Sequence, residues 1–428
     1  MNIQDIHNLF LQCKSLSIDT RKIQKDSMFF AIKGENFDAN TFAAAALELG
    51  ALFVIIDNAS YFIDKRTILV ENSLETLQEL AKFHRNYLKL PIIALTGSNG
   101  KTTTKELINV VLSKKYNTKA TVGNLNNHIG VPLTLLSFTK DTEIGIVEMG
   151  ANHKKEIEFL CEIAQPDYGY ITNFGKAHLE GFGGVEGVIE GKSEMYQYLI
   201  KNDKMAFVNL EDPIQLEKSK AIKSFTFGVN NERADIKIKN IQANPFVVVD
   251  YEYFNVKSHL IGLYNANNIN AAVAIGHYFK VENEAVKEAL ENYIPENNRS
   301  QLLKKGSNQI ILDAYNANPS SMAVAITNFL QLETKNKVMI LGDMFELGKE
   351  SHEEHKIIVD SLSNQDESVC YLIGKSFYEN KISNKNIKFF ETFEDFLNYL
   401  KTIHFVDNSI LIKGSRGMAL ERSLEYIS

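Results

Sequence analysis

The run from Thr96 to Glu106, TGSNGKTTTKE, constrains the fold most strongly because it joins an apolar strand to a helix through a glycine-rich turn. The strand is predicted at Ile92–Leu95, and Leu107, Val110 and Val111 share one face of the helix that follows. Backbone N–H groups of such a turn, together with the helix N-terminus, attract an anion. The sequence therefore predicts an α/β unit with a phosphate-binding turn.

This turn is shorter than the standard phosphate-binding loop, because the residue five positions before Gly100 is Leu95 rather than glycine. The run therefore reads GxxGKT. We expect Lys101 to reach the terminal phosphates and Thr102 to hold Mg²⁺. A structural turn that binds nothing is the alternative, and the flanking strand and helix favour phosphate binding. The residues predicted here to bind the phosphates of a nucleotide are Gly97, Ser98, Asn99, Gly100, Lys101, Thr102 and Thr103.

Length and composition limit the classes of protein that need to be considered. A chain of 428 residues with 44% hydrophobic and 23% charged residues is typical of a globular protein with two or three domains. The net charge of −7 argues against non-specific nucleic-acid binding, so an anionic ligand has to be bound locally.

The cysteines and the apolar runs indicate the compartment. Cys13, Cys161 and Cys370 are far apart and show no CxxC spacing, which argues against a disulfide framework and against a zinc site. The sequence shows neither a signal-peptide pattern nor an apolar run of about 18 residues. We therefore expect a cytoplasmic protein that does not span a membrane.

Apolar runs and prolines predict three domains, over residues 1–90, 91–294 and 295–428. In the first, the runs MFFAI and ALFVII alternate with an alanine-rich helix, which indicates a small α/β domain. The second repeats strand, loop and helix, which is typical of a mostly parallel sheet. Within it, the alternating runs FTFGV, ADIKI and FVVVDYEYF predict added antiparallel strands.

Four apolar runs of the third predicted domain each end in a polar loop. They are QIILDAYNANP, VMILGDMFELG, VCYLIGKS and SILIKGSRGM. Strands that end in polar loops and are separated by helices describe a doubly wound, Rossmann-like sheet with a ligand site at the strand C-termini. None of the four runs contains the GxGxxG motif of dinucleotide-binding folds. Arg299, Asp313, Lys413 and Arg416 lie in or next to these loops, which favours a shared ligand site.

Other polar residues of the central domain allow two interpretations each. Glu148 ends an apolar strand, so it could hold Mg²⁺ or simply be solvated. His178 lies in a glycine-rich loop and could be a functional, a packed or a surface histidine. By composition alone Lys192 is interpreted as a solvated helix lysine, and Asn265 and Asn268 as helix caps.

Six stretches together resemble the Mur ligase family, and the resemblance covers essentially the whole chain. They are TGSNGKTTTKE, NNHIGVPLTLL, EMGANHKKEI, TNFGKAHLEGFGG, DAYNANPSSM and LGDMFELG. The resemblance implies an N-terminal UDP-substrate-binding domain, a central P-loop-type ATPase and a C-terminal Rossmann-like domain. GVPLTLL, EMGANH, YNANPSSM and GDMFELG are most similar to the family member that joins D-alanyl-D-alanine to UDP-N-acetylmuramoyl-tripeptide.

The resemblance also implies roles for individual residues. Lys192 matches the lysine that the family carbamylates, and a carbamate would give an anion able to bind a second Mg²⁺. The implied catalytic residues are Lys101, Lys192 and His178, and the implied metal ligands are Thr102, Glu148, His178 and Lys192. Further ATP contacts implied are Asn265, Asn268, Arg299 and Asp313. Substrate contacts implied are Ser17, Asp19, Thr20, Arg21, Asn316, Asn318, Lys413, Ser415 and Arg416.

Two positions depart from the family pattern: Tyr264 stands where relatives often have histidine, and Asp38-Ala39-Asn40 where they read DGH. The implied reaction is ATP-dependent amide formation through an acyl phosphate, in peptidoglycan precursor synthesis. It would be carried out by a cytoplasmic monomer on small-molecule substrates, with no nucleic acid. The alternatives are a Mur-type ligase that adds the third stem-peptide residue, a folylpolyglutamate synthase-like ligase, and a nucleotide-switch protein.

Overall fold

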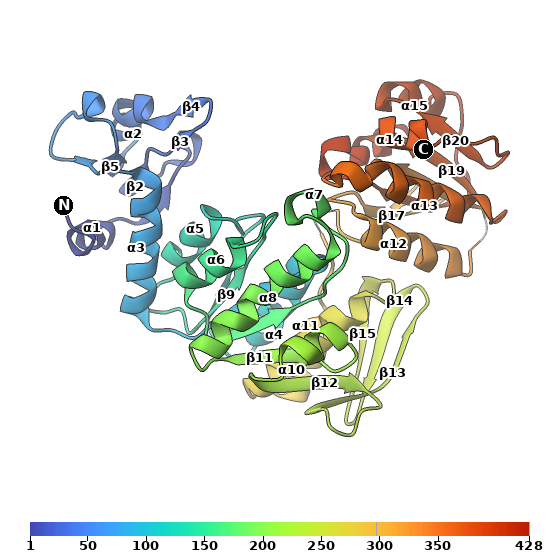
Figure 1. The fold of residues 1–428 in the computed structure, drawn as a ribbon, viewed down its shortest axis with the longest axis horizontal. Helices are drawn as coiled ribbons and strands as arrows, with labels where there is room; N and C mark the ends of the chain where they lie inside the picture. The colour runs from blue at the N-terminus through green and yellow to red at the C-terminus, as the bar shows by residue number, and fades with distance from the viewer. Residues whose placement is uncertain (297, 335, 428) are drawn as a thin grey trace.

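A computed structural model describes residues 1–296, 298–334 and 336–427. Three main sheets with flanking helices are arranged along the chain, so the predicted α/β class with three domains is confirmed (Figure 1). Each main sheet falls inside one of the predicted domains. The boundaries near residues 90 and 294 remain predictions.

The N-terminal sheet is parallel, in the order β1-β2-β5-β6. Its strands are β1 (Ser15–Ser17), β2 (Ser27–Phe30), β5 (Ala51–Ile56) and β6 (Thr67–Leu69). Around it lie α1 (Ile3–Phe10), α2 (Ala43–Glu48) and the hairpin of β3 (Lys33–Gly34) and β4 (Phe37–Asp38). The two predicted strands and the alanine-rich helix are therefore confirmed.

Helix α3 (Ser73–Leu88) leads from this domain to the central one (Figure 1). It begins at Asn72, whose side chain accepts hydrogen bonds from the N–H groups of Leu74 and Glu75. The helix packs against α1 on one side and against the central domain's α5 (Gly130–Leu136) and α6 (Glu156–Ala164) on the other. It therefore ties the first domain to the second.

The central sheet has nine strands in the order β15-β14-β13-β12-β11-β10-β7-β9-β8. The first five along the chain are β7 (Ile92–Thr96), β8 (Thr118–Ala120), β9 (Ile144–Glu148), β10 (Tyr168–Ile171) and β11 (Met205–Asn209). The others are β12 (Lys223–Val229), β13 (Ile236–Ala243), β14 (Phe246–Tyr251) and β15 (Asn255–Ile261).

The prediction of antiparallel strands in FTFGV and ADIKI is wrong for β12, which runs parallel to both β11 and β13, and it holds for β13 only in its pairing with β14. Helix α9 (Pro213–Lys218) carries the chain back between β11 and β12. Strand β13 starts beside the last residues of β12, so the chain steps back only slightly. The antiparallel pairs of this sheet are β13–β14 and β14–β15. Alternation in a sequence reports which face a side chain takes, and not the strand direction.

Both faces of the central sheet are covered. Ile92 and Ala94 of β7 belong to one buried cluster, and Ile93 and Leu95 belong to the other. The second face carries α4 (Lys101–Leu112), α10 (Asn265–Tyr278) and α11 (Asn283–Glu291). The first face carries α5, α6 and α8 (Val185–Lys201). A parallel strand buried on both faces is apolar throughout, which explains the run that precedes the phosphate turn.

The C-terminal sheet has the order β16-β17-β21-β18-β19-β20, and every neighbouring pair except β16–β17 is parallel. Its strands are β16 (Gln301–Lys305), β17 (Asn308–Asp313), β18 (Lys337–Gly342), β19 (Ser368–Ile373), β20 (Ile387–Phe390) and β21 (Ser409–Lys413). Its helices are α12 (Pro319–Gln331), α13 (Ser351–Ser363), α14 (Lys375–Glu379) and α15 (Phe393–Leu400). The four predicted strands are confirmed, and β16 and β20 were not predicted.

The strand order of this sheet creates a switch point. The chain leaves β17 and enters β18, and β21 later fills the place between them. The carboxyl ends of these three strands therefore meet at a switch point, where open α/β sheets bind ligands.

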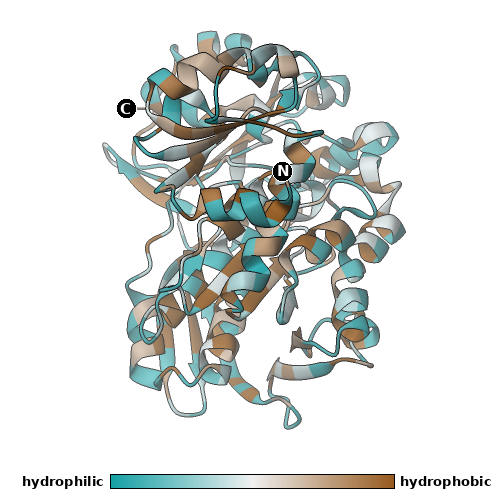
Figure 2. Cartoon of the chain, turned by 90° about the vertical axis from the view of Figure 1, so that its left-hand side faces the viewer, coloured by the Kyte–Doolittle hydropathy of each residue, from teal (hydrophilic) through white to brown (hydrophobic). Residues whose placement is uncertain are grey.

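The terminal domains lie at opposite ends of the molecule, on the same side of the central domain (Figure 1). Figure 2 shows helices that mix hydrophobic and hydrophilic residues, as expected of helices with one face against a sheet. Within the described residues, no helix combines the length and the apolar character needed to cross a membrane.

Candidate nucleotide-binding and active site

The phosphate turn between β7 and α4 packs directly on the end of β10. Gly97 has φ +141, and a Cβ placed there would lie 2.0 Å from Thr172 Oγ1. The Thr172 hydroxyl donates a hydrogen bond of 2.6 Å to the carbonyl of Asn99. Only glycine allows this approach, so the turn is held against a fixed strand end.

The N-terminus of helix α4 is open. Its N-cap is Gly100, with φ +80 and no side-chain cap. The N–H groups of Lys101, Thr102 and Thr103 lie in the first helical turn, where the helix offers no acceptor. Together with the helix dipole they would favour an anion at this end of α4.

Lys101 folds back on its own turn in this structure. Its Nζ donates to the carbonyls of Gly97 at 2.7 Å and Ser98 at 3.3 Å. Removal from water lowers the pKa of Lys101; the Glu148 charge opposes this shift and Arg299 adds to it. Lys101 and Arg299 therefore place two cations at this wall, which favours an incoming anion.

A cavity of about 710 Å³ lies beside this turn, between the central and C-terminal domains. It brings together most of the residues predicted for nucleotide, metal and acceptor binding. They are Ser98, Asn99, Gly100, Lys101, Thr102, Thr103, Glu148, His178, Asn265, Asn268, Arg299, Asp313, Asn316, Asn318 and Lys413. The cavity wall does not include Gly97, Lys192, Ser17, Asp19, Thr20, Arg21, Ser415 or Arg416.

Glu148 ends β9 at the cavity wall and is only 1% exposed. Its Oε1 accepts a 2.8 Å hydrogen bond from the side-chain amide of Asn126. Its Oε2 is buried and has no hydrogen-bond partner among the described residues. A buried carboxylate oxygen of this kind needs a partner, and a divalent cation fits the requirement.

A metal bound at Glu148 would have few protein ligands. Among the described residues, no group of three or more His, Cys, Asp or Glu side chains is placed to hold a metal ion. Mg²⁺ usually takes one or two protein carboxylates and completes its shell with phosphate oxygens and water. Glu148 and the hydroxyl of Thr102 at the cavity wall fit that donor set.

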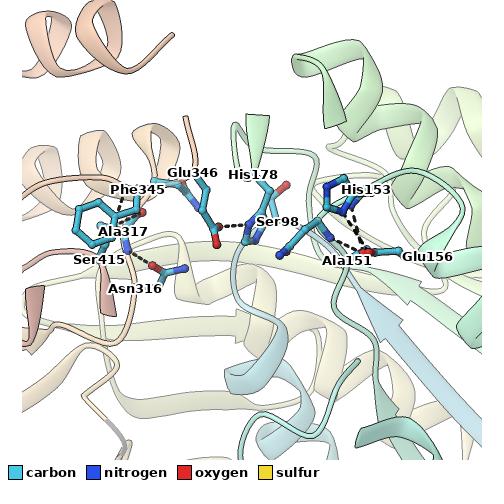
Figure 3. Close-up of polar contacts among 12 residues, drawn as sticks. Ser98, Ala151, His153, Glu156, His178, Asn316, Ala317, Phe345, Glu346 and Ser415 are labelled. Atoms are coloured by element: carbon cyan, nitrogen blue, oxygen red, sulfur yellow. Dashed lines mark hydrogen bonds and ion pairs between the residues drawn. The ribbon is translucent and has the colours of Figure 1, made fainter. Parts of the chain in front are cut away.

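His178, a predicted metal ligand, is engaged across the domain interface. It caps the short helix α7 (Leu179–Phe182), and its Nδ1 pairs with the carboxylate of Glu346 from the C-terminal domain (Figure 3). This hydrogen bond lowers the pKa of Glu346. The histidine is therefore in the cavity wall, but its Nδ1 is occupied by a carboxylate.

Further contacts join the phosphate turn region to the C-terminal domain. Asn318 Nδ2 donates to Asn99 Oδ1 at 2.7 Å, and the N–H of Lys176 donates to Ser320 Oγ at 2.8 Å. The Lys176 ammonium also pairs with Glu354 at 2.5 Å. The two domains that form the cavity are therefore already in contact.

Lys192 is buried in α8, with 1% exposure, so its interpretation as a solvated helix lysine is wrong. Its Nζ donates to the carbonyl of Ala151 at 3.1 Å and lies 4.9 Å from the ring centroid of Phe182. Burial, assisted by the charge of Lys101, lowers the pKa of Lys192 well below its usual value. A neutral amine is the form that adds CO₂, so the residue fits a carbamate.

Lys192 reaches the cavity only through its neighbours. It is absent from the cavity wall, whereas Ala151, which accepts its hydrogen bond, is part of that wall. A carbamate on Nζ would extend the side chain by a carboxylate. The predicted metal role of Lys192 therefore depends on that modification.

Asn265 and Asn268 are not helix caps, because the N-cap of α10 is Tyr264 and no side chain caps it. Asn265 donates to the carbonyl of Ile261 and accepts from Asn268 Nδ2, both at 2.8 Å. Asn268 Oδ1 accepts from Thr104 Oγ1 at 2.9 Å. The asparagines thus link α10 to α4 while they also line the cavity.

Asp313, at the end of β17, is held by a cation from the adjacent strand. Lys413 Nζ lies 2.6 Å from Asp313 Oδ2 and 3.3 Å from the carbonyl of Asn316, and Lys413 is 1% exposed. Tyr264, which departs from the family pattern, hydrogen-bonds through its hydroxyl to Ser300 Oγ at 2.6 Å. These residues form the cavity wall on the C-terminal side.

Ser415 joins the polar loops at the end of the C-terminal sheet. Its hydroxyl accepts from the N–H of Phe345 at 2.8 Å and donates to the carbonyl of Ala317 at 3.3 Å (Figure 3). Asn316 accepts from the N–H of Ala317. Arg416 is exposed and lies 3.4 Å from Glu421.

The predicted substrate residues of the first domain form a separate cluster after β1. Ser17 Oγ donates to the carbonyl of Asp19 at 2.8 Å. The Asp19 carboxylate accepts from the backbone and the guanidinium of Arg21, at 2.8 to 3.0 Å. Thr20 begins the short 3₁₀ helix that carries Arg21. This cluster lies outside the cavity wall.

Some residues that shape the site had no predicted role. Asn126 orients Glu148, Glu346 holds His178, and Asn173 holds the turn by accepting from the N–H of Asn99 at 3.1 Å. The sequence indicated these three residues only in part, because each lies in a stretch that carries the family resemblance. Their partners are distant in sequence, so their roles could not be inferred.

Comparisons with known proteins agree with this geometry. Residues 95–276 match the family description "Mur ligase middle domain", and residues 298–416 match "Mur ligase, glutamate ligase domain". A Bacillus subtilis protein named UDP-N-acetylmuramoyl-tripeptide–D-alanyl-D-alanine ligase is 34% identical, over 95% of this chain and 91% of that protein. The chain belongs to the Mur ligase family.

Solved structures of Mur ligases show the same three-domain fold. A crystal structure of MurF from Acinetobacter baumannii has a TM-score of 0.86 and 30% identity, and covers 99% of this chain and 98% of that one. A MurF ligase from Thermotoga maritima in complex with ADP has a TM-score of 0.84 and 29% identity, and covers 97% of each chain. The similarity therefore includes all three domains of this Mur ligase.

Proposed function

We propose that this Mur ligase joins D-alanyl-D-alanine to the terminal carboxylate of UDP-N-acetylmuramoyl-tripeptide, with ATP converted to ADP and phosphate. The observation that carries the proposal is the similarity to relatives of that name along nearly the whole chain. The open helix N-terminus and the unpartnered Glu148 oxygen in one cavity provide the chemistry that such a reaction needs.

The reaction is limited by charge repulsion, because a carboxylate has to attack an anionic phosphate. Lys101, Arg299 and the N–H groups at the start of α4 supply positive charge where the γ-phosphate would lie. The tripeptide carboxylate attacks the γ-phosphorus and ADP leaves, which gives an acyl phosphate. The amine of D-alanyl-D-alanine then attacks the acyl carbon, and phosphate and a proton leave as the amide forms.

Mg²⁺, when bound, would neutralise phosphate oxygens and align them for transfer. We propose two ions, held by Thr102, Glu148, a carbamylated Lys192 and His178. Support comes from the unpartnered Glu148 oxygen and from the buried Lys192 amine, whose pKa is strongly lowered. His178 becomes available once its contact with Glu346 is released.

The remaining predicted residues would bind the two other substrates. We propose that Ser17, Asp19, Thr20 and Arg21 contact the UDP portion. Asn316, Asn318, Lys413, Ser415 and Arg416 would contact the acceptor or orient the loops around it. Because the first cluster lies outside the cavity wall, the N-terminal domain would close over the tripeptide substrate, which would exclude water from the acyl phosphate.

The experiment that tests the function measures phosphate release from ATP with UDP-N-acetylmuramoyl-tripeptide, with and without D-alanyl-D-alanine, and detects the pentapeptide product. We expect release and product only with both substrates. Lys192→Ala should abolish release and keep ADP binding, and a short carboxylic acid should restore part of the rate. An unchanged rate in Lys192→Ala would exclude the carbamate.

The alternatives predict other outcomes of the same experiment. Activity only with UDP-muramoyl-dipeptide and a diamino acid would show the ligase that adds the third stem residue. Phosphate release that needs no small-molecule acceptor would show a nucleotide switch. We propose that the protein is a cytoplasmic monomer; its three cysteines are free, as is usual in a reducing compartment.

A further inference from the structure

Arg299 faces the cavity without a carboxylate partner. Its side chain makes no ion pair or hydrogen bond within the described residues, and its Nε is buried and unpartnered. It lies close enough to Lys101 to lower the pKa of that ammonium. An arginine of this kind needs some other contact to hold its guanidinium in place.

That contact is the ring of Tyr315. The guanidinium carbon of Arg299 lies 3.7 Å from the ring centroid, which is van der Waals stacking distance, and the Arg416 guanidinium lies 5.6 Å from the same centroid. Tyr315 and Arg299 both line the cavity. A cation over an aromatic face is stabilised without a counter-charge, so Arg299 keeps its full charge for a ligand.

The backbone on both sides of Arg299 is fixed to the same strand end. The N–H of Tyr315 donates to the carbonyl of Asn298 at 3.2 Å, and the N–H of Ser300 donates to Asp313 Oδ1 at 3.3 Å. Asn298 and Ser300 have φ values of +55 and +48, which turn the chain on either side of Arg299. The ring and the guanidinium are therefore brought together by the fold, and not by a flexible side chain alone.

We propose that Tyr315 is a positioning residue that holds the Arg299 guanidinium toward the phosphate groups of the bound nucleotide by ring stacking in place of an ion pair. The inference rests on the proposed nucleotide site and adds the group that orients its arginine. The ring does this work, and the hydroxyl is not needed for it. An acidic partner in the same place would neutralise the charge that the phosphates require.

The test is a double-mutant cycle read by calorimetric titration of ADP into the full chain, with no other substrate present. Tyr315→Leu should weaken ADP binding about three- to thirtyfold, which is the range of a partly desolvated cation–π contact. Tyr315→Phe should retain the affinity within about twofold. In an Arg299→Ala background, Tyr315→Leu should cause no further loss.

The matched control is a second arginine–aromatic stack in the same domain. Arg422 lies 3.8 Å from the ring centroid of Phe393, and neither residue lines the cavity. Phe393→Leu should leave ADP affinity unchanged. If Tyr315→Leu does not fold, Tyr315→Met takes its place in the double-mutant cycle with Arg299→Ala. Tyr315→Phe remains the variant that keeps the ring.

Two results would overturn the inference. One is a Tyr315→Leu loss that persists in the Arg299→Ala background, which would mean that Tyr315 binds the nucleotide directly. The other is an unchanged affinity in Tyr315→Leu. If the wild-type chain fails to bind ADP at all, the proposed nucleotide site itself is wrong, so the two failures are distinguishable.

Discussion

Lowering the pH should loosen the attachment of the N-terminal domain, because two buried histidines join it to the rest of the chain. His7 of α1 and His84 of α3 are 2% and 3% exposed, and their rings are joined by a 3.0 Å hydrogen bond from His7 Nε2 to His84 Nδ1. His84 Nε2 lies 3.0 Å from the carbonyl of Phe138, so it has to carry a proton and donate it. That leaves His84 Nδ1 as the acceptor, and both rings are neutral.

The size of the effect follows from the pKa of His7. Burial, and then the neighbouring His84, lower the pKa of His7 from 6.5 to about 4. The unfolded chain therefore takes up a proton as the pH falls below 6.5, whereas the folded chain resists until about pH 4. The contribution of His7 to the free energy of unfolding is therefore complete at pH 7 and falls by at most about 2 kcal/mol by pH 5. The loss is smaller where entering water screens the charge.

Hydrogen exchange of peptides from α1, corrected for the intrinsic pH dependence, measures this change locally. Exchange should be faster at pH 5 than at pH 7 by up to about thirtyfold. His7→Phe should remove most of this difference, while the exposed His404→Gln should keep it. Equal corrected rates at both pH values in the wild type, or the full difference in His7→Phe, would refute the reasoning.

Two further predictions concern the phosphate turn and the metal site. Gly97→Ala should weaken ADP binding more than tenfold, because the added Cβ has no room. The control is Gly123→Ala, which should bind ADP normally because Gly123, with φ +58, has nothing within 4 Å of an added Cβ. Calorimetry compares the two variants, and equal affinities would contradict the packing argument. Asn126→Ala removes the amide that orients Glu148. It should raise the Mg²⁺ concentration needed for half-maximal phosphate release about tenfold, with a matching change in Mg²⁺-dependent ATP binding. An unchanged Mg²⁺ requirement would contradict a metal role for the Glu148 carboxylate.

Local sequence patterns predicted a strand or helix correctly where a single physical requirement, such as burial on both faces, determines the pattern. The apolar run before the phosphate turn became β7 because a strand covered on both faces has to be apolar throughout. The parallel pairing of β12 with β11 and β13 was missed, since alternation carries no information about strand direction. Strands β16 and β20 lie at the edges of their sheet, and no prediction covered them.

The environment of single side chains was harder to predict. From the residues next to it in the sequence, Lys192 is expected to lie on the surface. Only the packing of α8 shows that it is buried. Asn265 and Asn268 look like caps by position, but their partners lie on another helix and strand. Burial depends on what covers a helix face, which sequence spacing does not state.

The sequence by itself determined the phosphate turn and the polar strand ends, because these depend on residues that are adjacent along the chain. Only the tertiary structure decided which polar groups meet. The Asp313–Lys413 pair, the His178–Glu346 contact and the Tyr315 stack arise from strand order and domain contact. Such contacts join residues that are close in space and not always in sequence, so their chemistry becomes visible only when the sheets and domains are in place.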